Sequence, residues 1–111
     1  MEKSFDPKVY EHIGIADLIL FSIHSLISKK EDCTFERLVK ECFTFFPRVF
    51  NFSEYPEWPD SRKLDRSLRS LRQERLIDGD PKTFFSLTKR GEKEALEIEK
   101  RLKQKRLEFT L

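Results

Sequence analysis

The sequence predicts a mainly helical single domain that carries one short β-hairpin. Two observations lead to this fold class. Apolar residues recur at steps of three and four over several stretches of the chain, as they do along one face of a helix. A β-branched and aromatic run follows residues 78–81 (Asp-Gly-Asp-Pro), which is typical of a strand after a turn. The 111 residues suffice for one core, expected at about residues 9–88, with a C-terminal helix at about 89–107.

The first two helices are predicted from their apolar spacing. One covers about residues 9–28, where the apolar residues fall mostly at helical spacing: Ile15, Leu18, Ile19, Leu26 and Ile27. After a polar turn, Thr34 is placed to cap a second helix, with Glu36 in its first turn near the positive end of the helix dipole. The amphipathic stripe of this second helix consists of Phe35, Leu38, Val39, Cys42, Phe43 and Phe46. Pro47 ends it.

An aromatic loop is expected at residues 47–60, because three prolines in this stretch exclude a regular element. Its aromatic residues are Phe50, Phe52, Tyr55 and Trp58. Two interpretations are open. The loop can be a lid that packs on the core, or it can be an exposed docking surface whose contacts with a partner are made by Phe50, Tyr55 and Trp58.

A third helix is predicted over about residues 61–75, capped by Asp60 or Ser61. Its apolar positions are Leu64, Leu68 and Leu71. At 100° per residue, one polar row falls on the opposite side: Arg62, Arg66, Arg69 and Gln73. A charged face of this kind is often only the solvated side of a helix.

The hairpin and the last helix complete the predicted elements. Leu76 and Ile77 lead into the turn at 78–81, and residues 83–87 form the returning strand. The last helix opens at residues 88–91, and Gly91 in its first turn indicates a close approach to a neighbouring element.

The order helix, helix, loop, helix, hairpin, helix resembles that of the winged helix-turn-helix superfamily, and in particular MarR- and PadR-type transcription regulators. The resemblance covers about residues 60–102 and rests on two runs: Leu64-x-x-x-Leu68-x-x-Leu71-x-x-x-x-Leu76-Ile77 and Phe85-x-Leu87-Thr88-x-x-Gly91. It implies a three-helix core, a two-stranded wing and a C-terminal helix. It also implies that the chain binds double-stranded DNA, regulates transcription and works as a dimer.

Under this resemblance the third helix enters the major groove, where arginine forms bidentate hydrogen bonds with guanine. The expected base contacts are Arg62, Arg66, Arg69 and Gln73, and the expected phosphate contacts are Lys63 and Arg72. The charge distribution favours DNA contacts in the second half of the chain. Residues 1–61 carry 7 basic and 11 acidic side chains, whereas residues 62–111 carry 15 basic and 9 acidic side chains. The wing turn, with Asp78 and Asp80, would repel phosphates, and the aromatic loop is longer than the usual turn of about 3–4 residues.

The last helix offers a second surface. Its narrow apolar stripe of Ala95, Ile98 and Leu102 is a candidate seam for a homodimer. An alternative function for the whole chain, of a different class, is a protein-interaction module that docks a partner through the aromatic loop and the wing.

Several classes of protein are not expected. The longest apolar run is far below the roughly 20 residues of a membrane span, and the first residues do not resemble a signal peptide. Two cysteines form no disulfide framework, so we expect a reducing cytoplasm. No metal or phosphate motif and no catalytic spacing is present, so we expect no metal, no cofactor and no enzymatic activity.

Overall fold

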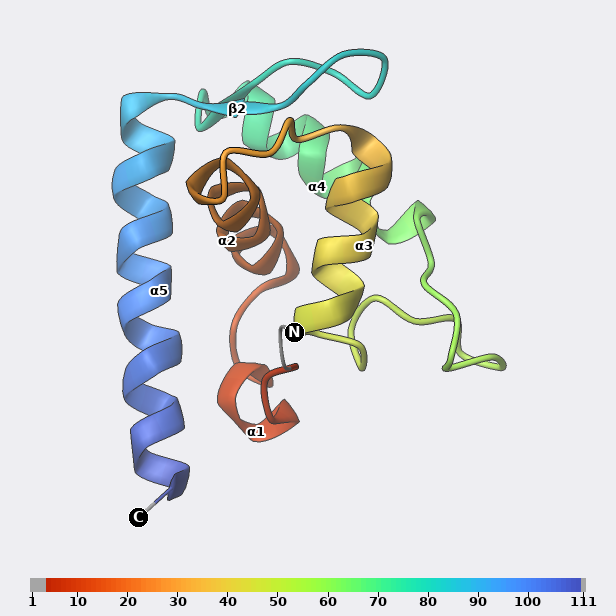
Figure 1. The fold of residues 1–111 in the computed structure, drawn as a ribbon, viewed down its shortest axis with the longest axis vertical. Helices are drawn as coiled ribbons and strands as arrows, with labels where there is room; N and C mark the ends of the chain where they lie inside the picture. The colour runs from red at the N-terminus through yellow and green to blue at the C-terminus, as the bar shows by residue number, and fades with distance from the viewer. Residues whose placement is uncertain (1–3, 111) are drawn as a thin grey trace.

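A computed structural model describes residues 4–110 of the chain and the side chains of residues 4–107 (Figure 1). The elements in order are α1 Pro7–Tyr10, α2 Ile15–Ser28, α3 Phe35–Phe45, α4 Arg62–Gln73, β1 Ile77–Asp78, β2 Ser86–Leu87 and α5 Lys89–Thr110. The two strands are antiparallel, with Ile77 opposite Leu87 and Asp78 opposite Ser86. The predicted mainly helical fold with one small hairpin is therefore confirmed. In the part of the chain that the structure describes, no helix is long and apolar enough to cross a membrane.

Helix α2 is the centre of the fold. It contacts α3, α4, α5 and β2, and Figure 1 shows it enclosed between α5 on one side and α3 on the other. Residues 18–23 are all buried, which means that every side of the helix is covered. The one polar side chain in this run is Ser22, and its hydroxyl donates a hydrogen bond to the Leu18 carbonyl at 2.9 Å. A helix buried all round belongs in the core.

The first predicted helix was too long. Instead of one helix over about residues 9–28, the chain forms α1, bends at residues 11–14, and begins α2 after Gly14, whose backbone is extended. Asp6 caps α1 by accepting a hydrogen bond from the Lys8 amide at 2.9 Å. The bend lets α1 lie against α5, with Tyr10 packed edge-on against Phe46 at 5.0 Å between ring centroids.

Helix α3 is built as its sequence predicts. The Thr34 hydroxyl accepts a hydrogen bond from the Arg37 amide at 3.2 Å and so caps the helix. The buried residues of α3 are Leu38, Glu41, Cys42 and Phe45, whereas Phe35, Val39 and Phe43 of the predicted stripe are half-buried against the core. Glu41 is the charged member of this set, and its carboxylate is paired with the Lys29 ammonium at 2.7 Å and the Ser25 hydroxyl at 2.7 Å. These bonds satisfy a buried charge, which would otherwise be costly.

The hairpin is shorter than predicted. The expected strand at residues 83–87 is reduced to Ser86 and Leu87, and Phe84 is exposed. Phe85 is buried, and its amide donates a hydrogen bond to the Cys33 carbonyl at 2.9 Å instead of to β1. The returning chain therefore turns from β1 toward the segment that precedes α3, and the hairpin is fastened to that helix.

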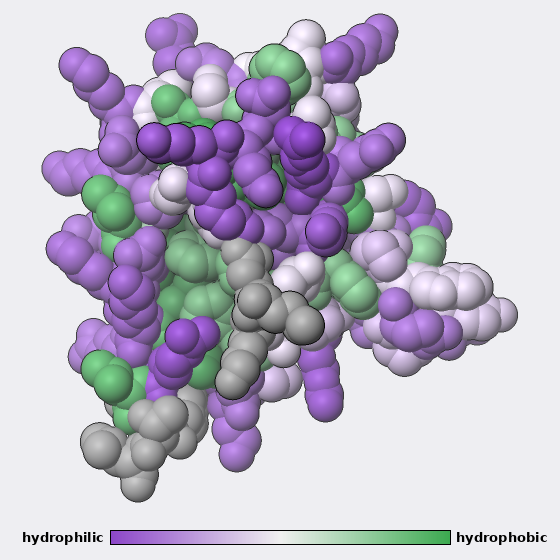
Figure 2. Space-filling view, viewed as in Figure 1, coloured by the Kyte–Doolittle hydropathy of each residue, from purple (hydrophilic) through white to green (hydrophobic). Residues whose placement is uncertain are grey.

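Helix α5 lies along α2 and α1, and its apolar stripe faces inward. Ala95, Ile98 and Leu102 are each 0% exposed, so the expectation that they form a homodimer seam is wrong. The core of the same chain occupies their whole surface, and Figure 2 shows a largely hydrophilic outer side of α5 on the face in view. The Arg101 guanidinium pairs with the Asp17 carboxylate of α2 at 3.2 Å.

The junction between the hairpin and α5 explains the Thr88-x-x-Gly91 run. The Thr88 hydroxyl accepts a hydrogen bond from the Gly91 amide at 3.0 Å, which caps α5, and donates one to the Arg75 carbonyl at 2.7 Å. A Cβ atom on Gly91 would lie 1.8 Å from the Leu76 carbonyl oxygen. The predicted close approach at this glycine is therefore confirmed.

Replacing Gly91 by alanine tests this junction. Helix propensity alone favours alanine by about 1 kcal/mol. Because the added methyl group meets backbone atoms that cannot move away alone, we expect Gly91→Ala to lower the free energy of unfolding by about 1–3 kcal/mol, measured by urea denaturation.

Gly14→Ala is the matched control, because a Cβ at Gly14 meets no atom within 4 Å. The free energy of unfolding of this control should differ from that of the wild type by less than about 1 kcal/mol. Equal stability of the Gly91→Ala variant and the wild type would contradict the packing described here.

Candidate nucleic-acid interface and the adjoining aromatic loop

Helix α4 separates its apolar and basic residues onto opposite sides. Its buried residues are Leu64, Ser67, Leu68 and Leu71, and the helix contacts α2. The predicted polar row of Arg62, Arg66, Arg69 and Gln73 is exposed along its whole length. The six residues expected to contact DNA nevertheless fall into two groups, because the side chains of three of them bond to other residues of the chain and those of the other three do not.

Arg62 is held at the start of α4 by an ion pair. Its Nε and Nη2 atoms donate to the two carboxylate oxygens of Asp60 at 3.0 and 3.1 Å, and its guanidinium lies 5.2 Å from the centre of the Phe52 ring. Asp60 is almost fully buried and also accepts the Arg62 amide at 3.1 Å, so it acts as the cap of the helix. The hydrogen bonds from Arg62 lower the pKa of the Asp60 carboxyl, and the same pair raises the pKa of Arg62.

Lys63 and Arg72 hold the two ends of α4 in place. The Lys63 ammonium donates to the Val49 carbonyl at 3.0 Å, which ties the first turn of the helix to the aromatic loop. The Arg72 guanidinium donates to the Gly79 carbonyl at 3.2 Å, which ties the last turn to the hairpin turn. These two residues were predicted to bind phosphate, and the structure gives them a positioning role.

Arg66, Arg69 and Gln73 are different. Their side chains are exposed and form no hydrogen bond, ion pair or ring contact with any residue that the structure describes. They lie three and four positions apart, so that their side chains follow one another along one side of the helix. The structure therefore presents two arginines and one glutamine on a helix whose ends are fixed.

The aromatic loop is buried at one end and exposed at the other. Phe50 is 1% exposed and packs with Phe46, at 6.4 Å between ring centroids, so the proposal that Phe50 contacts a partner is wrong. It anchors the loop because its side chain fills the core. Tyr55 and Trp58 are 51% and 55% exposed, and their rings are stacked on each other at 5.0 Å. The lid interpretation thus holds for Phe50, whereas Tyr55 and Trp58 face solvent.

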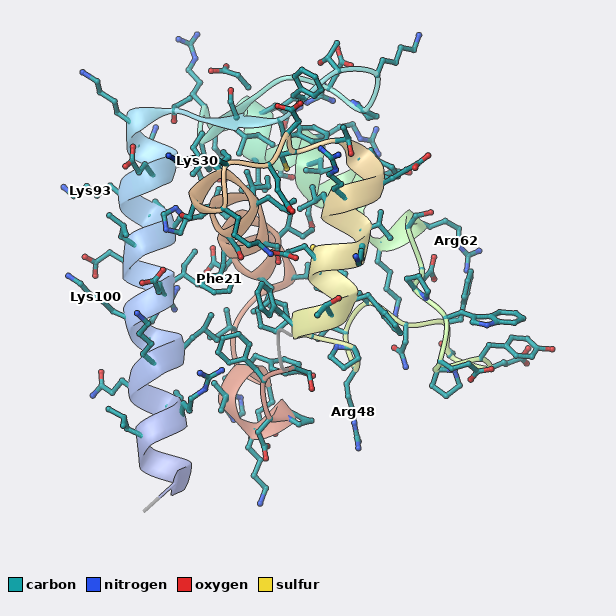
Figure 3. The ribbon with its side chains drawn as sticks, viewed as in Figure 1. Phe21, Lys30, Arg48, Arg62, Lys93 and Lys100 are labelled. Carbon is teal, nitrogen blue, oxygen red and sulfur yellow. The ribbon has the colours of Figure 1, made fainter. Side chains whose placement is uncertain are left out.

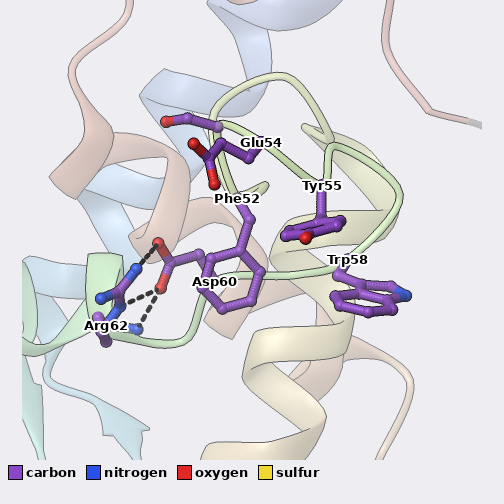
Figure 4. Close-up of a pocket in the computed structure, with 7 residues that line it drawn as sticks. Phe52, Glu54, Tyr55, Trp58, Asp60 and Arg62 are labelled. Atoms are coloured by element: carbon purple, nitrogen blue, oxygen red, sulfur yellow. Dashed lines mark hydrogen bonds and ion pairs between the residues drawn. The ribbon is translucent and has the colours of Figure 1, made fainter.

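A hollow of about 430 Å³ opens between the exposed rings and the start of α4 (Figure 4). Its lining consists of Phe52, Ser53, Glu54, Tyr55, Trp58, Asp60 and Arg62. Glu54 and Asp60 were not singled out from the sequence as residues of a binding surface. The signal that could have found them is the run of three carboxylates in the loop, at Glu54, Glu57 and Asp60.

The two cysteines are core residues. Burial raises the pKa of the Cys33 thiol to about 12, and burial likewise raises the pKa of Cys42. Both thiols are therefore neutral at physiological pH and poor metal ligands. Among the residues that the structure describes, no group of three or more histidine, cysteine, aspartate or glutamate side chains could hold a metal ion.

Comparison of the chain with protein-family models, with curated proteins and with solved structures finds no match in any of the three.

The Asp60–Arg62 pair predicts a pH-dependent contribution to stability. Because the pKa of Asp60 is lowered in the folded state, its stabilisation is fully present above the ordinary aspartate pKa of about 3.9 and is lost as pH falls through the lowered pKa. Asp60→Asn should therefore unfold more easily than the wild type at pH 7. The difference in the free energy of unfolding between the two proteins should shrink as the pH is lowered below about 4. Urea denaturation at each pH measures this difference.

Asp78→Asn is the control, since Asp78 is exposed and forms no side-chain bond with a described residue. At pH 7 its free energy of unfolding should lie within about 0.5 kcal/mol of the wild-type value. A difference between Asp60→Asn and the wild type that stays constant down to acid pH would show that the ion pair is not the source of the stability.

Proposed function

We propose that this protein is a small winged-helix protein that binds duplex DNA by placing α4 in the major groove, as a transcription regulator does. The observation that carries the proposal is the row formed by Arg66, Arg69 and Gln73, which is exposed and engaged with no described residue. Arginine pairs with the O6 and N7 atoms of guanine, and glutamine with the N6 and N7 atoms of adenine. A helix of twelve residues with this row outward has the dimensions that the major groove admits.

The arrangement of the other elements supports the same proposal. The hairpin follows α4 directly, and it is fastened to α4 by the Arg72–Gly79 hydrogen bond and to the start of α3 by the Phe85–Cys33 hydrogen bond. The helices and the hairpin therefore form one unit. Because these contacts fix α4 relative to the hairpin, the free side chains of α4 would reach a duplex with little loss of conformational freedom in the backbone.

The engaged cations would make a smaller contribution. Arg62 already satisfies the buried Asp60 carboxylate, and a phosphate would have to share its guanidinium. Lys63 and Arg72 each donate one hydrogen bond to a backbone carbonyl. The hairpin turn carries Asp78 and Asp80, which repel phosphates, so we assign the main DNA contacts to α4 and not to the wing.

The double variant Arg66→Ala/Arg69→Ala tests the proposal. Wild-type protein should bind random-sequence duplex DNA near about 50 mM salt, with log affinity falling linearly as log salt rises. On random-sequence DNA these two arginines would neutralise phosphates instead of pairing with a fixed guanine. Each neutralised phosphate contributes about 0.9 to that slope, so the double variant should bind more weakly and lose about 1–2 units of slope. Fluorescence anisotropy of a labelled duplex over a salt series measures both quantities.

Lys93→Ala/Lys100→Ala is the matched control. It removes the same charge from the outer side of α5, where both lysines point into solvent (Figure 3). We expect it to retain the wild-type slope. Absence of DNA binding by the wild-type protein at about 50 mM salt would refute the proposed function. Equal losses in the two double variants would show only unspecific attraction by net charge, and would refute the assignment to α4.

A further inference from the structure

The hollow beside α4 is lined by aromatic rings and carboxylates. We propose that it is a docking site for an arginine side chain of a basic partner polypeptide, which would stack on the exposed ring of Trp58 or Tyr55 and pair with Glu54. Both aromatic rings and the Glu54 carboxylate line the same hollow. The proposal does not depend on DNA binding, because neither Arg66 nor Arg69 belongs to the hollow.

The exposed rings are held on a fixed backbone. The Phe52 amide donates to the Trp58 carbonyl at 3.0 Å, and the Trp58 amide donates to the Tyr55 carbonyl at 3.0 Å. The base of the loop is closed by the Asp60 amide, which donates to the Phe50 carbonyl at 2.7 Å. Two large rings are thus kept in solvent by a loop that is anchored in the core through Phe50. A preformed site of this kind loses little entropy when a ligand binds.

The charge of the loop selects a cationic ligand. Residues 47–60 carry three carboxylates, at Glu54, Glu57 and Asp60, and one basic residue, Arg48. Arg48 is not among the residues that line the hollow. The Arg62 guanidinium at the edge of the hollow is already matched by Asp60, while Glu54 and Glu57 form no bond with a described residue. An incoming cation would therefore meet a net negative surface.

The protein already contains the same combination of groups once. Arg62 lies over the Phe52 ring and pairs with the Asp60 carboxylate, so a guanidinium is held between an aromatic face and an acid at the wall of the hollow (Figure 4). Trp58, Tyr55 and Glu54 line the same hollow, and none of their side chains has a cationic partner among the described residues. Tryptophan gives the strongest cation–π attraction, and arginine is the cation found most often on such rings.

Exposed aromatic rings also stack on the bases of single-stranded nucleic acid. Such sites add a positively charged groove that follows the phosphates. The carboxylates of Glu54 and Glu57 would instead repel a phosphate backbone. A basic polypeptide is therefore the occupant that the charges favour.

The test uses Trp58 as its own reporter, since it is the only tryptophan in the chain. A peptide of alternating glycine and arginine, titrated into the full chain, should change the Trp58 emission and reach saturation. Glu54→Gln/Glu57→Gln should weaken this binding roughly tenfold, because the charge pairing is lost. Glu92→Gln/Glu94→Gln removes the same charge from α5 and should bind as the wild type does.

Trp58→Leu and Tyr55→Leu, measured with a dye-labelled peptide and checked by circular dichroism, should retain the fold and lose the binding. The proposal is overturned if the glycine–arginine peptide causes no saturable change, or if a glycine–glutamate peptide binds equally well. Tighter binding of single-stranded oligothymidine than of the basic peptide would assign the rings to nucleobases instead, and would also overturn it. Loss of DNA binding in Arg66→Ala/Arg69→Ala leaves each of these outcomes unchanged, so the two proposals fail separately.

Discussion

The burial of α2 on every side is the constraint on which the rest of the structure depends. A run of six buried residues, from 18 to 23, cannot be covered by one neighbour, so α3, α4, α5 and β2 surround it. Each large aliphatic side chain buried in this way contributes about 1.5–3 kcal/mol relative to exposure. Because Leu64, Leu68 and Leu71 must face α2, the arginines on the other side of α4 have no place except the surface.

The position of α4 along its own axis depends on a smaller set of polar contacts. Lys63 and Arg72 fasten its two ends to the aromatic loop and to the hairpin turn, and Asp60 caps it. These contacts divide the basic residues of the helix into those that hold it and those that remain free. The free pair, Arg66 and Arg69, lies between the two fastened turns. The orientation of the helix that carries them would therefore be fixed before a duplex binds.

Periodicity predicted the elements with a strong stripe. Helices α3 and α4 lie where their apolar residues placed them, and Thr34 and Gly91 have the expected roles. The bend at residues 11–14 was missed because the apolar residues before it continue the helical spacing. Gly14, which precedes α2 with an extended backbone, is the sequence signal that could have marked it.

Side-chain roles that depend on distant partners could not be predicted. Lys63 bonds to Val49 and Arg72 to Gly79, and no local pattern distinguishes these cations from Arg66. The stripe at Ala95, Ile98 and Leu102 has the same spacing whether it faces a second copy or the chain's own core, and the structure places it in the core. In the aromatic loop, composition gave no means of separating the buried Phe50 from the exposed Trp58.

We propose that Arg66 and Arg69 are available to DNA, whereas the guanidinium groups of Arg62 and Arg72 are already hydrogen-bonded to Asp60 and to the Gly79 carbonyl. Nuclear magnetic resonance of the arginine Nε–Hε groups, recorded while duplex DNA is added, measures this directly. We expect the resonances of Arg66 and Arg69 to shift most, and those of Arg62 and Arg72 to shift less. Unchanged Arg66 and Arg69 resonances alongside shifts in the arginines of α5 would contradict it.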